Sequence, residues 1–200
     1  MRTGQWRAGA LLPACLLAAA ALLFGKGAWI YAKAELAQGL LRGAWSRTVA
    51  GGKQVKPWPW ADTWPVAKLE IPGARSSFIV LAGASGRTLA FGPGHLDGSA
   101  PPGSAGNCVL SAHRDTQFRA LRGLSRGDRV VVETADRRRH EYRVVELAVV
   151  DRRDTAFLEG TPDEALTLVT CYPFDAVVPG GPLRYVVRAV PAGGNRPDLY

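Results

Sequence analysis

The sequence predicts an all-β fold, a barrel of eight strands with short helices, preceded by one N-terminal transmembrane helix. An uncharged apolar run fills residues 8–25. Beyond residue 58, short runs rich in β-branched residues alternate with glycine- and proline-rich turns, which is typical of closed sheets. The part of the chain beyond about residue 58, roughly 140 to 150 residues, suits one domain with a single apolar core.

The N-terminal run predicts a membrane helix. Residues 8–25 are mostly Leu and Ala, and at about 1.5 Å per residue they reach roughly 27 Å, close to the thickness of a bilayer core. Aromatic and basic side chains flank both ends, as in interfacial anchors: Arg2, Trp6, Arg7, Lys26, Trp29, Tyr31 and Lys33. The alternative is a signal peptide cleaved near residues 32–34, but the intervening aromatic residues place that site far downstream. We therefore predict a retained anchor over residues 1–34.

A short helical stalk is expected to follow the anchor. Leu36, Leu40 and Leu41 recur at helical spacing, and Gly51 and Gly52 then interrupt the helix, followed by a proline- and tryptophan-rich segment. These signals predict a linker over residues 35–57 and one catalytic domain over residues 58–200.

Eight runs within this domain are predicted to be strands because β-branched and aromatic residues dominate them. They are residues 66–71, 78–81, 88–91, 107–112, 129–133, 141–150, 165–170 and 185–190. One helical turn is predicted near residues 117–124, and the glycine- and proline-rich residues 92–106 are predicted to form a long loop.

Composition argues against several classes of function. The net charge of +8 is spread along the chain, and its densest basic run, residues 137–140, lies between two predicted strands, where a solvated hairpin is expected. We therefore predict no nucleic-acid partner. The three cysteines lack the paired spacing of a zinc site, and the acids of residues 151–164 are too dispersed for calcium. No metal and no cofactor are expected.

A cysteine and a histidine each stand where a predicted strand ends, which is where a rigid scaffold presents reactive groups: Cys171 and His113. A thiol with an ordinary pKa of about 8.5 needs nearby positive charge to become substantially ionised at neutral pH. Arg184 begins the last predicted strand and is placed to return beside Cys171, where it would stabilise an oxyanion. Cys108 falls on the opposite strand face from His113, which favours a position in the core for Cys108. A disulfide between Cys108 and Cys171 is the alternative.

Three motifs resemble those of the sortase family, and they occur along the chain in the family's order. Residues 167–171 (TLVTC) match its TLxTC motif, residues 112–115 (AHRD) resemble its histidine motif, and residues 183–187 (LRYVV) look like its arginine strand. The resemblance runs from about residue 58 to residue 190, and residues 58–65 are similar to the small single-domain sortases of Gram-negative bacteria.

The resemblance implies an eight-stranded sortase-type β-barrel and a cysteine transpeptidase. Cys171 would attack the Thr–Gly carbonyl of a Leu-Pro-X-Thr-Gly-like sorting signal near the C-terminus of a protein substrate, and an unidentified amine would open the thioester. His113 would transfer the protons, while Arg184 would hold the signal and the oxyanion. The family also implies a periplasmic catalytic domain held at the cell inner membrane by one helix.

Other polar residues have less defined roles. Thr170 is expected to contribute a backbone group or its hydroxyl to the oxyanion site. The alternative is that it packs as an ordinary strand threonine. Asp115 is expected either to orient His113 or to cap a helix. His95 is expected to be a loop residue, and His140 a solvated hairpin residue.

Two other functions remain open at this point. A cysteine hydrolase would resolve the same thioester with water instead of an amine. A non-catalytic, membrane-tethered basic β-domain would bind anionic partners through its positive charge.

Overall fold

One long helix, α1 (Gln5–Val49), precedes the barrel. The computed structural model describes residues 5–178 and 180–193, and it gives the side chains of residues 5–31 only in part. The chain divides into two compact units, residues 1–39 and 40–200. The predicted stalk is the last part of α1, which ends where Gly51 adopts a φ of +100° and the Gly52 N–H donates to Arg47 O at 3.0 Å. A left-handed glycine of this kind commonly closes a helix.

The predicted transmembrane helix receives no support from the structure. Most side chains of residues 8–25 fall outside the set that the structure describes. Within that set, no helix is both long and apolar enough to cross a membrane.

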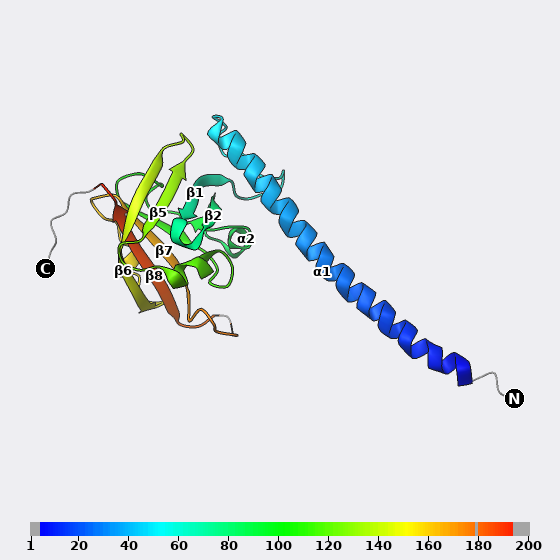
Figure 1. The fold of residues 1–200 in the computed structure, drawn as a ribbon. Coiled ribbons are helices and arrows are strands. Elements are labelled where there is room, and N and C mark those ends of the chain that lie inside the picture. The colour runs from blue at the N-terminus through cyan, green and yellow to red at the C-terminus, as the bar shows by residue number, and fades with distance from the viewer. Residues whose placement is uncertain (1–4, 179, 194–200) are drawn as a thin grey trace. The chain divides into compact units, whose positions relative to one another are not determined.

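Eight strands close into a barrel, which confirms the predicted fold (Figure 1). Around the barrel the order is β1 (Pro65–Ile71), β2 (Ser76–Ala82), β3 (Gly94–His95), β4 (Asn107–Ser111), β7 (Ala165–Tyr172), β8 (Leu183–Pro191), β6 (Arg139–Asp151) and β5 (Arg129–Thr134). Pairing of β1 with β5 closes the circle. Neighbours are antiparallel, except that β2 and β3 are parallel, as are β4 and β7. The short helices are η1 (Pro72–Ala74), α2 (Gly86–Leu89), η2 (Gln117–Gly123) and η3 (Ala156–Leu158).

Two local predictions are wrong, and each has a physical reason. Residues 88–91, predicted as a strand, belong largely to α2 and the turn after it, because the Ser85 hydroxyl accepts the Thr88 N–H at 3.3 Å and caps a helical turn. The predicted loop 92–106 contains the strand β3. A Cβ at Gly94 would lie 2.3 Å from Gly83 O, so this short strand requires a glycine and shows no strand periodicity.

Alternate strand residues fill the barrel interior, as the period-two rule requires. Leu69, Leu110, Tyr142 and Leu168 are all fully buried there, and Cys108 is 1% exposed, so its predicted core position is confirmed. The outer face of β4, β7 and β8 carries a second buried cluster: Val109, Val169 and Val186. Residues 152–164, here called the β6–β7 loop, cover this outer face with Phe157 and Leu158.

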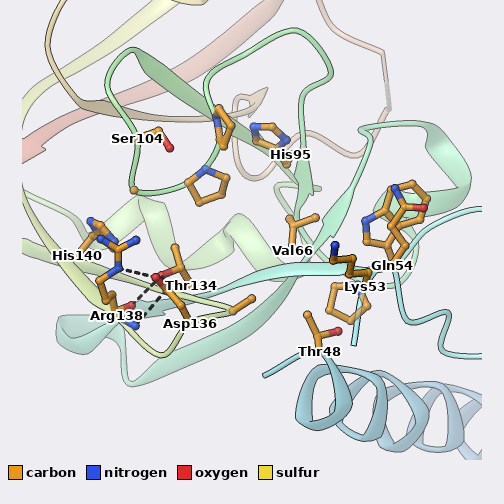
Figure 2. Close-up of a pocket in the computed structure, with 16 residues that line it drawn as sticks. Thr48, Lys53, Gln54, Val66, His95, Ser104, Thr134, Asp136, Arg138 and His140 are labelled. Atoms are coloured by element: carbon orange, nitrogen blue, oxygen red, sulfur yellow. Dashed lines mark hydrogen bonds and ion pairs between the residues drawn. The ribbon is translucent and has the colours of Figure 1, made fainter. Parts of the chain in front are cut away.

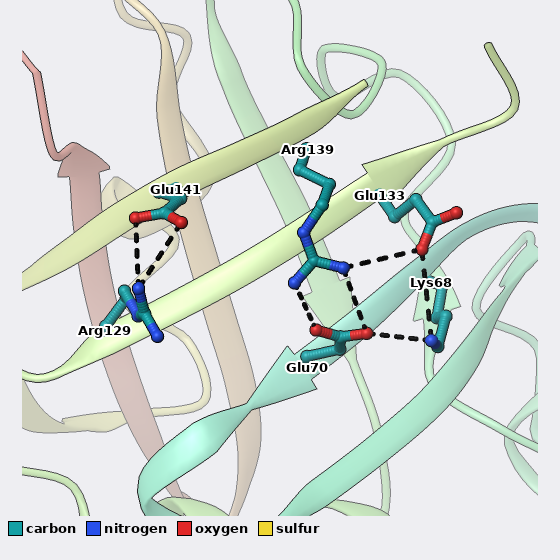
Figure 3. Close-up of polar contacts among 6 residues, drawn as sticks. All are labelled: Lys68, Glu70, Arg129, Glu133, Arg139 and Glu141. Atoms are coloured by element: carbon teal, nitrogen blue, oxygen red, sulfur yellow. Dashed lines mark hydrogen bonds and ion pairs between the residues drawn. The ribbon is translucent and has the colours of Figure 1, made fainter. Parts of the chain in front are cut away.

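An ion-pair network crosses the outer surface of β1, β5 and β6 (Figure 3). Arg139 Nη2 lies 2.6 Å from Glu70 Oε2, and Lys68 Nζ lies 2.8 Å from Glu70 Oε1. The hydrogen bond from Arg139, followed by that from Lys68, lowers the pKa of Glu70 to about 2. Within the basic run at residues 137–140, Arg138 and Arg139 each have an acidic partner.

His140 differs from the predicted solvated hairpin residue. It lies on the same face of β6 as buried Tyr142, its side chain is 18% exposed, and its Nδ1 lies 3.3 Å from Glu164 Oε1. The prediction failed because the partner of His140 comes from a distant part of the chain.

Candidate active site

The barrel brings three predicted residues to one end of its outer face. Cys171 in β7 lies directly opposite Arg184 in β8 in the antiparallel register, a pairing that places Cα atoms about 5 Å apart. β4 runs parallel to β7 with Ser111 opposite Val169, so His113, two residues beyond Ser111, emerges beside the end of β7. Cys171, His113 and Arg184 all line one cavity of about 350 Å³.

One wall of this cavity is apolar. It is formed by Leu96, Val109, Phe157, Leu158 and Val169. The reactive groups therefore share a cavity with apolar side chains, a combination that suits a peptide with apolar residues.

A buried asparagine holds the β6–β7 loop over this wall. Asn107 is 2% exposed, and its Nδ2 donates to Phe157 O at 2.9 Å and to Glu159 O at 3.0 Å. Its Oδ1 accepts the Thr167 hydroxyl at 2.7 Å. The amide nitrogen of Asn107 thus fixes the loop, while its oxygen bonds to strand β7. Sequence reasoning missed Asn107 because its loop partners lie 50 and 52 residues away.

The environments of the cysteines differ, and all three are free. Burial, with the nearby Glu164 charge as a smaller cause, raises the pKa of Cys108 to about 12, which keeps it protonated. Cys171 is half-buried and lines the cavity, whereas Cys15 lies in α1. The disulfide left open by the sequence is not formed, and Cys171 is the thiol placed for nucleophilic chemistry.

Thr170 connects β7 to the corner that carries His113. Its hydroxyl donates to Ala112 O at 2.7 Å, and the Ala112 N–H donates to Val169 O at 3.3 Å. Thr170 is 2% exposed and, by strand alternation, faces away from Cys171. The hydroxyl is therefore engaged in positioning the histidine corner beside the cysteine.

Asp115 occupies an exposed turn next to this corner. Its carboxylate makes no hydrogen bond or ion pair within the described part of the chain, and η2 has Thr116 at its N-cap without a side-chain cap bond. Neither of the two predicted contacts of Asp115, with His113 or with a helix terminus, is formed among these residues.

Arg184 is anchored by the backbone around it. Its Nη1 donates to Gly181 O and to Leu183 O, both at 2.9 Å, and the side chain is partly buried. These two bonds hold one nitrogen of the guanidinium at the start of β8, directly across from Cys171. The other nitrogens of the planar group remain suited to binding a developing oxyanion in the cavity.

A larger cavity, of about 790 Å³, has none of these groups in its lining (Figure 2). His95 and His140 line it, but His95 Nε2 lies 2.9 Å from Ala100 O and His140 is paired with Glu164. His95, predicted as a loop residue, belongs to the short strand β3. No cysteine lines this cavity, and no group of three or more potential metal ligands occurs among the described residues. The reactive constellation therefore belongs to the smaller cavity.

Comparison with known proteins agrees with the site and the barrel. Sortase D of Bacillus subtilis (strain 168) is 35% identical over 122 residues, which cover 60% of this chain and 60% of that relative. Among solved structures, sortase A from Corynebacterium diphtheriae is similar with a TM-score of 0.61 and 26% identity, covering 81% of this chain and 86% of the other. A Clostridium perfringens sortase D5 transpeptidase is similar with a TM-score of 0.59 and 25% identity, covering 76% and 89%.

The family assignment follows from these findings together. The match to the Bacillus relative spans only 60% of that protein's length. The family model for the sortase domain, however, matches residues 69–192, which include Cys171, His113 and Arg184. With this match and with the same barrel as the solved sortases, the chain belongs to the sortase family.

Proposed function

We propose that the chain is a sortase-type cysteine transpeptidase that acts on a Leu-Pro-X-Thr-Gly-like sorting signal and transfers the acyl group to an amine. One observation carries the proposal: Cys171, His113 and Arg184, which come from three separate motifs, line one cavity with an apolar wall. That wall suits the leucine and proline of such a signal, and the thiol lines the same cavity.

The first half of the reaction forms a thioester. The Cys171 thiolate attacks the carbonyl carbon between threonine and glycine, and the negative charge that develops on the carbonyl oxygen is stabilised by Arg184. Collapse of this intermediate breaks the C–N bond, and His113 gives a proton to the leaving amine. The acyl group is then bound to the sulfur of Cys171.

The second half transfers the acyl group. An amine attacks the thioester carbon, His113 accepts its proton, and the C–S bond breaks to regenerate the thiolate. Water would give a carboxylic acid through the same steps, so the outcome depends on which nucleophile reaches the carbon.

Product analysis tests this function directly. The full-length protein in detergent is incubated with a Leu-Pro-X-Thr-Gly-type peptide, with and without a primary amine such as triglycine, and the products are identified by mass spectrometry. We expect a new amide that joins the threonine to the amine. Formation of the acid alone at high amine concentration would support a hydrolase, and an unchanged peptide would contradict both enzymatic functions.

We further propose that one N-terminal span holds the protein at the cell inner membrane with its catalytic domain in the periplasm. The support comes from the sequence, in which residues 8–25 carry no charge and aromatic residues flank the run.

Protease treatment of spheroplasts tests this topology. We expect an added protease to digest the chain beyond about residue 58, because sorting signals are processed after export in this family. A cytoplasmic protein of the same cells controls for lysis. Complete protection in intact spheroplasts, lost on permeabilisation, would contradict the proposed topology.

A further inference from the structure

Arg114 follows His113 directly, yet it is buried and does not line the cavity. It is 8% exposed, and it is the one charged residue that is buried in the part of the chain described with side chains. No ion pair neutralises it among these residues, and its Nη1 is buried there without a hydrogen-bond partner. Burying an unpaired guanidinium disfavours folding, and an apolar side chain would fill the same space without that cost.

The contacts of Arg114 are with a single loop. Its Nη2 donates to Ala176 O at 2.8 Å and to Val178 O at 3.1 Å. Both carbonyls belong to residues 173–178 and 180–182, here called the β7–β8 loop. Arg114 therefore links the backbone of this loop to the corner that carries His113.

The β7–β8 loop is bound to the active site at both of its ends. It begins two residues after Cys171 and ends two residues before Arg184, whose Nη1 also donates to Gly181 O. Its middle has little apolar packing of its own, since Val177 is 97% exposed and Val178 is 76% exposed. Among the described residues, the hydrogen bonds from Arg114 thus join the middle of the loop to the corner that carries His113.

We propose that Arg114 is a positioning residue that holds the β7–β8 loop against the His113 corner and so determines whether an amine or water resolves the thioester. This inference rests on the proposed transpeptidase function. The loop connects Cys171 to Arg184, and both of these residues line the cavity in which the thioester would form. We therefore expect a fixed loop to limit the access of water to the thioester carbon. When the loop is released, water adds its oxygen to the acyl carbon, His113 accepts one proton, and the C–S bond breaks to give the acid.

The test compares variants of the full-length protein. Arg114→Gln removes the charge and the guanidinium fork, whereas Arg114→Lys keeps the charge with a single donor group. Arg119→Gln, at an exposed position in η2, is the matched control. Amide and acid products of a Leu-Pro-X-Thr-Gly-type peptide are quantified at one fixed triglycine concentration, and Tm is measured for each variant.

We expect the amide-to-acid ratio to fall about tenfold in Arg114→Gln, the effect of losing a hydrogen bond to a charged group, and to fall less in Arg114→Lys. Limited proteolysis should cut the β7–β8 loop faster in both variants than in Arg119→Gln. If Arg114→Gln does not fold, Arg114→Lys still decides the outcome.

Two different results would distinguish a failure of this inference from a failure of the proposed transpeptidase function. An unchanged ratio in the Arg114 variants, with only a lower Tm, would reduce Arg114 to a purely structural residue and overturn the inference. A wild-type protein that forms no amide would instead overturn the proposed transpeptidase function on which the inference depends.

Discussion

Cys171→Ala is expected to abolish turnover of a Leu-Pro-X-Thr-Gly-type peptide while leaving the fold intact. No thioester forms without the sulfur, and loss of a catalytic nucleophile typically lowers kcat by a factor on the order of 10⁴ to 10⁶. Cys171 is half-buried near the end of β7, so removing one atom should disturb the barrel little. The measurements are peptide cleavage and thermal unfolding of the same preparation.

Cys108→Ala is the matched control for this experiment. Cys108 is 1% exposed in the core, and its thiol is held protonated by burial. Its loss should lower the free energy of unfolding by about 1 kcal/mol and leave kcat/KM near the wild-type value. If the Cys108 variant were inactive and the Cys171 variant active, the assignment of the nucleophile would be wrong.

Enrichment in β-branched and aromatic residues located every strand of the barrel that is longer than two residues. It failed at β3, because a strand of two residues is too short to show a pattern of side chains. Position 94 requires a glycine because a neighbouring backbone oxygen leaves no space for a side chain. It also failed at residues 88–91, where a capped turn overrides the β propensity of the residues. In both places a local backbone requirement, invisible to a hydrophobic pattern, determined the structure.

The residues of the candidate site also fall into two groups, those that the sequence predicted and those that it did not. Short motifs were sufficient to predict Cys171, His113 and Arg184 as site residues, because each motif is local in the sequence. The residues that hold the walls of the site depend instead on partners far along the chain. Asn107 binds carbonyls 50 and 52 residues away, and Arg114 binds carbonyls 62 and 64 residues away. Only the folded barrel reveals which buried polar groups meet.

Arg184→Lys is expected to impair catalysis severely although the positive charge is retained. In the structure one guanidinium nitrogen already donates to Gly181 O and Leu183 O, which leaves the rest of the planar fork for the oxyanion. A lysine offers one compact ammonium on a flexible stem, so it cannot occupy the backbone carbonyls and the oxyanion position in the same fixed geometry. The loss of one well-placed oxyanion donor typically costs about 10² to 10³ in rate.

The measurement is kcat/KM for a Leu-Pro-X-Thr-Gly-type peptide with Arg184→Lys beside Arg188→Lys. Arg188 lies on the same strand and the same outer face, but it lines a separate cavity of about 240 Å³ and is paired in register with Thr167. If Arg184 merely fills a strand end, lysine should serve equally well there, because both side chains carry the same charge and a long apolar stem. Near-normal activity at position 184, or a larger loss at position 188, would remove Arg184 from the reaction. The chemistry would then rest on Cys171 and His113 alone.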